Sequence, residues 1–165
     1  MINSVSVVSS KDSQCWISTL KGVFLVDYLS GEEIHKFKPD AQPPVNNVFG
    51  TQQGLAFAAN NKGDVFVLNE NGEISNEFST IKNPVNTDVS VHASRIAMID
   101  NDGGVKVWNE KGELIATLKE EKAGEKTKVL SFNHQGESIA TAGFRSILFD
   151  KIYSKNNVIQ IWNVD

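Results

Sequence analysis

Short apolar runs alternate with polar turns along the chain. Residues 104–118, GVKVWNEKGELIATL, contain an alternating apolar run, a polar turn and a second apolar run. This is the pattern of two strands joined by a short hairpin. Residues 22–37 and 63–78 repeat it, and residues 157–165 supply the first half of a fourth copy. The chain is therefore predicted to be a repeat of β-hairpins.

Two more short apolar runs precede each hairpin and the half-hairpin, so the first three copies each predict four strands and the last predicts three. No segment of helical period interrupts them. A polar residue closes the third strand of each copy, and the intervals between these residues are 42, 40 and 54. The first two intervals match the 40 to 45 residues of a four-stranded propeller blade. The residues that mark the repeat are Asp27, Asn69, Asn109 and Asn163.

We therefore predict an all-β, propeller-like fold that forms a single domain over 1–165. It has about four blades of four-stranded antiparallel sheet, and the last blade lacks its outer strand because the chain ends after a third strand pattern. The central strands are apolar on both faces, which requires a sheet stacked on each side. The predicted blades are 4–37, 46–78, 87–118 and 128–165, with an insertion at 144–156.

Residues 133–143, NHQGESIATAG, are followed by VIQIWNVD, and the pair resembles the WD-repeat pattern of a turn, a small-residue strand and a strand ending in Trp-Asp. VKVWNEKGELIATL is similar, with Asn109 at the Asp position. The resemblance implies a β-propeller that presents turns to protein partners. No copy carries the Gly-His pair that opens a WD repeat, so we expect packing to hold the blades together without the family's buried hydrogen-bond network.

The two ends of the predicted array leave three alternatives open. The chain is a truncated or split piece of a longer propeller, a half that pairs with a second copy into an eight-bladed ring, or a closed four-bladed monomer. An open array exposes apolar residues of its first and last blades, and such a patch marks an interface. We therefore expect association with a protein partner or a second copy. The residues expected at these faces include Val5, Val7, Ile159 and Ile161.

Composition narrows the location and the class of partner. The formal charge of -4 argues against nucleic-acid binding, which usually requires concentrated positive charge. No apolar run is long enough to cross a membrane, so we expect no membrane partner. Cys15 is the one cysteine and is expected to be a small buried hydrophobe in a strand. Because it leaves no intramolecular disulfide, a reducing, cytoplasmic location is predicted.

Catalytic and cofactor sites are not predicted. The three histidines lie in different repeats with no second ligand at metal-binding spacing. Glutamates recur beside the turns because the hairpin recurs, and residues 100–104, DNDGG, lack the later acidic ligand of a calcium loop. We therefore predict a non-enzymatic protein with no catalytic, cofactor-binding or metal-binding residues. The residues considered are His35, His92, His134, Glu32, Glu33, Glu73 and Glu113.

The insertion at 144–156, FRSILFDKIYSKN, is the candidate partner-binding loop. Loops on a rigid scaffold often bind partners, and aromatic residues near an arginine are common interface anchors. The alternative is that the segment folds back over the open end of the array or extends the sheet as a hairpin. The candidate residues are Arg145, Ile147, Leu148, Phe149, Ile152 and Tyr153.

The preferred function is a protein-protein interaction scaffold. The alternatives are a ligand-binding or enzymatic propeller with a site at the central channel, and a fragment of a larger propeller without independent function. The innermost strands offer few polar residues for a channel site, which favours the scaffold. Those residues are Asn46, Asn47, Asp88 and Lys128.

Overall fold

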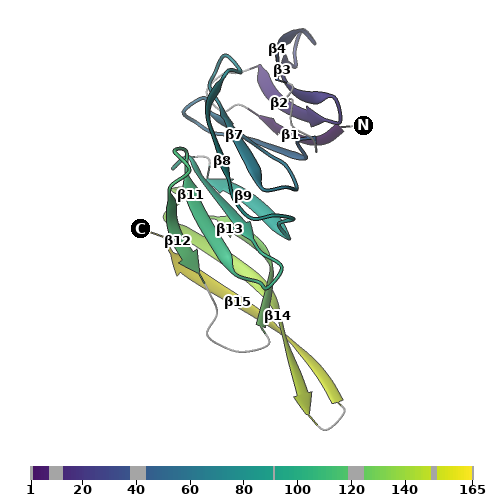
Figure 1. Cartoon of the computed structure of the whole chain (residues 1–165), viewed down its shortest axis with the longest axis vertical. Helices are drawn as coiled ribbons and strands as arrows, with labels where there is room; N and C mark the ends of the chain where they lie inside the picture. The colour runs from purple at the N-terminus through teal and green to yellow at the C-terminus, as the bar shows by residue number, and fades with distance from the viewer. Residues whose placement is uncertain are drawn as a thin grey trace. The chain divides into compact units, whose positions relative to one another are not determined.

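The computed structural model describes residues 2–7, 13–37, 44–90, 92–118, 125–149 and 152–164. These residues form an all-β structure of four antiparallel sheets, in which each strand pairs with the next one along the chain (Figure 1). Three sheets have four strands, and the last has three in the described part of the chain. The predicted fold class is confirmed.

The strands follow the apolar runs of the sequence. The first sheet contains β1 (Ile2–Val7), β2 (Gln14–Thr19), β3 (Gly22–Asp27) and β4 (Glu33–Phe37). The second contains β5 (Asn47–Gly50), β6 (Ala56–Ala59), β7 (Asp64–Leu68) and β8 (Ile74–Ser79). The third contains β9 (Asn86–Ser90), β10 (Arg95–Ile99), β11 (Val105–Asn109) and β12 (Leu114–Leu118). The fourth contains β13 (Glu125–Phe132), β14 (Ser138–Phe149) and β15 (Ile152–Asn163).

The chain divides into two compact units, which are described separately. Unit 1 comprises residues 1–82 and 110–112, and unit 2 comprises residues 83–109 and 113–165. Unit 1 contains the first two sheets, and unit 2 contains the strands of the last two. The single domain expected over 1–165 stays a prediction.

The core of unit 1 lies between the first and second sheets. Alternate residues of a strand face opposite sides of its sheet, so Trp16 shares one face with its cross-strand partner Leu25. This face of the first sheet packs against Ala56 and Leu68 of the second sheet. We call the face that carries Trp16 and Leu25 the leading face, and the face of the next sheet that covers it the trailing face.

Unit 2 repeats this arrangement with the third and fourth sheets. Ala97 pairs with Val107 in register, as Trp16 pairs with Leu25, and both form the leading face of the third sheet. They pack against Leu130 and Ile139 of the trailing face of the fourth sheet. Each unit is thus two sheets joined through the same pair of faces.

The polar residues that mark the first three repeats organise the turns of their hairpins. In the second sheet, Asn69 Oδ1 accepts hydrogen bonds from the amides of Asn71 and Glu73, and its Nδ2 donates to the Glu73 carboxylate at 3.0 Å. In the third sheet, Asn109 Oδ1 accepts from the Glu113 amide and its Nδ2 donates to the Glu113 carboxylate. These two recurring glutamates therefore hold turns, as the hairpin explanation predicts.

Candidate interaction surfaces

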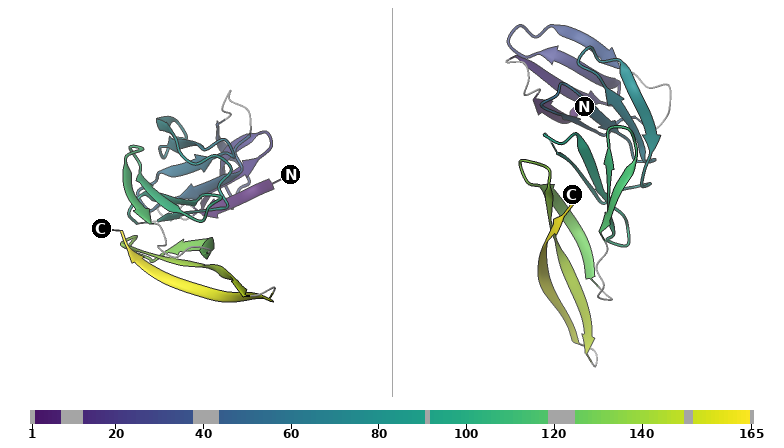
Figure 2. Two further views of the ribbon diagram at one scale, coloured as in Figure 1. Left: turned by 60° about the horizontal axis from the view of Figure 1, so that its bottom comes forward. Right: turned by 90° about the vertical axis from the view of Figure 1, so that its left-hand side faces the viewer.

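The predicted partner-binding segment is a hairpin and not a loop. The β14–β15 ladder continues from the pair Ser138 and Asn163 to the pair Phe149 and Ile152 without a register shift. Each strand has twelve residues, whereas β13 has eight. The hairpin extends as a long twisted ribbon beyond β13 (Figures 1 and 2). The backbone of the insertion therefore matches the alternative in which it extends the sheet as a hairpin.

Five of the six candidate residues lie in this extension, and the sixth, Arg145, pairs with Glu125 at the start of β13. The backbone of Leu148 pairs with that of Tyr153, and Phe149 pairs with Ile152. Their side chains lie outside the described part of the structure. Their role in partner binding stays a prediction.

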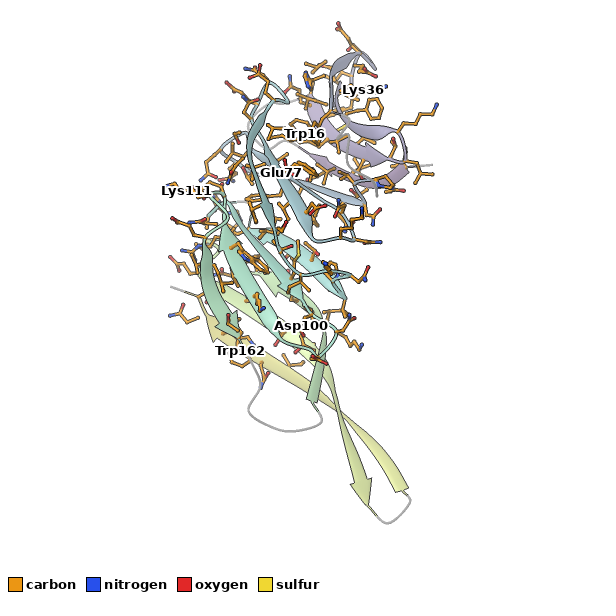
Figure 3. The ribbon with its side chains drawn as sticks, viewed as in Figure 1. Trp16, Lys36, Glu77, Asp100, Lys111 and Trp162 are labelled. Atoms are coloured by element: carbon orange, nitrogen blue, oxygen red, sulfur yellow. The ribbon has the colours of Figure 1, made fainter. Side chains whose placement is uncertain are left out.

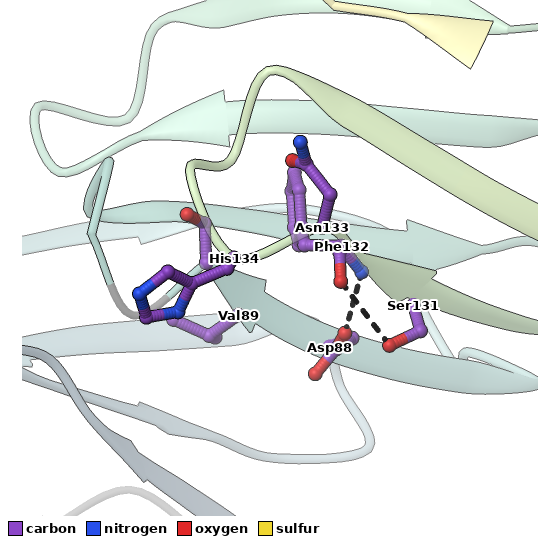
Figure 4. Close-up of a pocket in the computed structure, with 7 residues that line it drawn as sticks. Asp88, Val89, Ser131, Phe132, Asn133 and His134 are labelled. Atoms are coloured by element: carbon purple, nitrogen blue, oxygen red, sulfur yellow. Dashed lines mark hydrogen bonds between the residues drawn. The ribbon is translucent and has the colours of Figure 1, made fainter. Parts of the chain in front are cut away.

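Within each unit, the first strands of the two sheets are joined by equivalent hydrogen bonds. In unit 1, the Ser6 hydroxyl accepts from the Gly50 amide at 2.8 Å. In unit 2, the Asp88 carboxylate accepts from the Phe132 amide at 2.9 Å (Figure 4). When the strand pairing is followed from the strand that carries each repeat marker, Ser6 and Asp88 fall at the same position of the repeat. Gly50 and Phe132 likewise occupy one position of the next sheet.

Asp88 also lines a cavity of about 210 Å³ within unit 2 (Figure 4). The other lining residues come from β9, β13 and the turn that follows β13, and Asp88 is the one carboxylate among them. General acid–base chemistry needs a titratable group within hydrogen-bond reach of the proton that it transfers. The described geometry instead gives Asp88 a structural hydrogen bond between β9 and β13.

The structure brings together two histidines that the sequence separates. His92 and His134 lie in equivalent turns of the third and fourth sheets, with their Nε2 atoms 2.7 Å apart. Their rings meet edge to face, with centroids 4.0 Å apart. One ring donates and the other accepts, so the two histidines have opposite roles at Nε2. The sequence places these two histidines in different repeats and did not predict their contact.

Metal binding receives no support from this pair, because two nitrogens do not complete a coordination shell. Among the described residues, no group of three or more His, Cys, Asp or Glu side chains could hold a metal ion. In the segment DNDGG, Asp100 Oδ1 accepts from the amides of Asp102 and Gly104, so this carboxylate closes its own turn.

The sequence predicts that the blades lack the buried hydrogen-bond network of WD repeats, but one hydrogen bond of that kind is present in the fourth sheet. Trp162 Nε1 donates to Thr141 Oγ1 at 2.9 Å. Trp16 differs, because its Nε1 is buried and makes no hydrogen bond within the described part of the chain. Both tryptophans are labelled in Figure 3. The expectation that packing alone holds the blades is therefore wrong for the fourth sheet.

The leading face of the fourth sheet is exposed. Ile161 occupies the repeat position of Leu25 and Val107, which are buried in the first and third sheets. Ile161 is 78% exposed, and its neighbours on the same face, Ile159 and Val129, are 76% and 51% exposed. The sequence-based expectation of exposed apolar residues here is confirmed for Ile159 and Ile161.

The trailing face of the first sheet is also partly exposed. Val5 is 57% exposed, and Phe24 and Val26 are half-buried. The Lys36 ammonium, labelled in Figure 3, lies 5.1 Å from the centroid of the Phe24 ring. Cys15 on the same face is buried as predicted, and burial raises the pKa of its thiol. The side chain of Val7 lies outside the described residues.

Comparisons with protein-family models and with curated proteins found no match to this chain. Across the described ranges, no helix is long and apolar enough to span a membrane.

Proposed function

We propose that the chain is a non-enzymatic protein-protein interaction scaffold built from WD-like propeller blades, located in the cytoplasm. The observation that carries this proposal is the exposed leading face of the fourth sheet, with Val129, Ile159 and Ile161 at its surface. The equivalent faces of the first and third sheets are covered by another sheet. A stacked sheet is thus the kind of surface that this face fits.

The polar groups support a structural role better than a catalytic one. Asp88 accepts an amide hydrogen bond between strands, and the carboxylates of Glu73 and Glu113 accept hydrogen bonds from turn asparagines. The buried Cys15 thiol, with its raised pKa, is poorly suited to act as a nucleophile. Its burial as the lone cysteine also agrees with the proposed reducing compartment.

Site-specific photocrosslinking tests the scaffold function. The photoreactive residue p-benzoylphenylalanine replaces Ile161 in one variant and Leu29 in the control. Both positions are 78% exposed, but Leu29 lies in a turn of the first sheet. We expect protein adducts at position 161 and at least tenfold fewer at position 29, in extract from the native source. Equal yields at the two positions, or no adduct at position 161, would contradict the proposal.

A further inference from the structure

Two faces of the same repeat are exposed in this chain, and they are of opposite kinds. The fourth sheet exposes a leading face, on which Ile161 is 78% exposed. The first sheet exposes part of a trailing face, on which Val5 is 57% exposed. In both units a leading face is covered by a trailing face. The chain therefore carries both halves of an interface that it already uses twice.

The apolar residues of these faces match those of the covered pairs. On the fourth sheet, Ile159 and Ile161 replace Val23 and Leu25, which are at most 1% exposed in the first sheet. On the first sheet, Phe24 occupies the repeat position of Phe66, which is buried in the core of unit 1. Similar side chains are thus buried at one copy of the interface and exposed or half-buried at the other.

The polar part of the interface is repeated as well. Ser131 occupies the repeat position of Ser6 and Asp88, whose side chains accept an amide hydrogen bond from the following sheet. Its hydroxyl donates to the adjacent Phe132 carbonyl at 3.5 Å, which leaves its oxygen able to accept. Val7 of β1 occupies the position of the amide donors Gly50 and Phe132.

We propose that the leading face of the fourth sheet binds the trailing face of the first sheet of a second copy of this chain. The inference rests on the proposed scaffold function and names its partner. Ile159 and Ile161 of one copy pack against Val5 and Phe24 of the other, and Ser131 Oγ accepts the Val7 amide. The contact is heterologous, because each copy contributes a different face.

A complementation experiment tests this arrangement. Ile161→Asp places a carboxylate on the leading face of the fourth sheet, and Val5→Asp places one on the trailing face of the first. A buried, unpaired carboxylate opposes association. Sedimentation equilibrium then gives the mass of the unmodified chain, of each variant and of their equimolar mixture. We expect the unmodified chain to associate at micromolar concentration and each variant to be a monomer.

The mixture is the decisive sample, because it retains one unaltered interface. Ile161→Asp keeps an intact first sheet, and Val5→Asp keeps an intact fourth sheet, so the mixture forms a dimer with one chain of each kind. This dimer also shows that both variants are folded. A monomeric unmodified chain, a monomeric mixture, or a Val5→Asp variant that still associates alone would overturn the proposal.

The outcome is distinguishable from failure of the scaffold function. If Ile161 crosslinks to a different protein while the purified chain stays monomeric, the second-copy proposal is contradicted and the scaffold function is retained. If position 161 gives no adduct in extract or in the purified chain, both proposals are contradicted.

Discussion

Asn69 and Asn109 make the same turn hydrogen bonds in two copies of the repeat, so the repeated sequence forms repeated turns. Each accepts with its side-chain oxygen the backbone amide of a glutamate four residues later, and donates its side-chain amide to the carboxylate of the same glutamate. A register shift lies at the same place in both ladders, with Ser75 and Ile115 as the extra residues in the strands that follow the turns. The glutamates that could be mistaken for catalytic acids are therefore parts of the hairpin turns.

Asp27 holds the equivalent turn as a carboxylate. The Ser13 hydroxyl and then the Ser30 amide donate to it, and these hydrogen bonds lower the pKa of the Asp27 carboxyl below its usual value. A lowered folded-state pKa gives stability that is present above the unfolded-state pKa, and is lost as the pH falls through the folded-state pKa. Asp27 therefore contributes to acid sensitivity.

We predict that Asp27→Asn removes this contribution. The amide keeps the accepting oxygen, as Asn69 and Asn109 do, but does not titrate in this range. Melting temperatures measured from pH 7 to about pH 2.5 should fall less steeply for Asp27→Asn than for the unmodified chain. Asp27→Ala is the control, because it loses the turn hydrogen bonds at every pH. Parallel pH profiles for the unmodified chain and Asp27→Asn would contradict this account.

The residues that sequence reasoning missed depend on contacts between sheets. His92 and His134 are 42 residues apart, and Asp88 and Phe132 are 44 apart. A local pattern predicts each strand but not which side chains meet across two packed sheets. The one available signal was their spacing, which is close to the repeat length.

At the scale of elements, the strands and turns were predictable because each apolar run is bounded by polar turn residues. The insertion at 144–156 was harder, because the same apolar and aromatic residues fit a binding loop and an extended hairpin. The backbone pairing between β14 and β15, which begins at Ser138 and Asn163, makes this segment a hairpin. Sequence periodicity alone did not decide between these structures.

We predict that shortening this hairpin preserves the fold of unit 2. Replacing residues 146–155 by Asn-Gly joins the paired residues Arg145 and Asn156 through a two-residue turn. The core residues Leu130 and Ile139 lie at the other end of the ladder. Urea denaturation should show a change of less than about 0.5 kcal/mol in the free energy of unfolding.

The double variant Phe149→Ser and Tyr153→Ser is the matched full-length control. If the candidate residues bind a partner, both variants should lose that binding and stay folded. Loss of the folded state in either variant would instead mean that the segment completes the core, and would contradict its role as a binding surface.

At the scale of the whole molecule, each unit covers one leading face with one trailing face. The class and number of sheets followed from the sequence, because four copies of one pattern predict four similar sheets. The exposure of Ile161 followed from its place in the last predicted blade and not from its residue type, because Ile161 and Leu25 are both apolar residues at the same repeat position. Leu25 is 1% exposed and Ile161 is 78% exposed.

The most direct test of this account is amide hydrogen exchange at three equivalent positions, Val7, Gly50 and Phe132, measured by NMR in dilute and concentrated samples. In the dilute sample, we predict slow exchange at Gly50 and Phe132, whose amides donate to Ser6 and Asp88, and faster exchange at Val7. In the concentrated sample, exchange at Val7 should slow by at least about tenfold as the Ser131 side chain of a second copy accepts its amide. An exchange rate at Val7 that is the same at both concentrations would contradict the claim that the repeated interface also joins two chains.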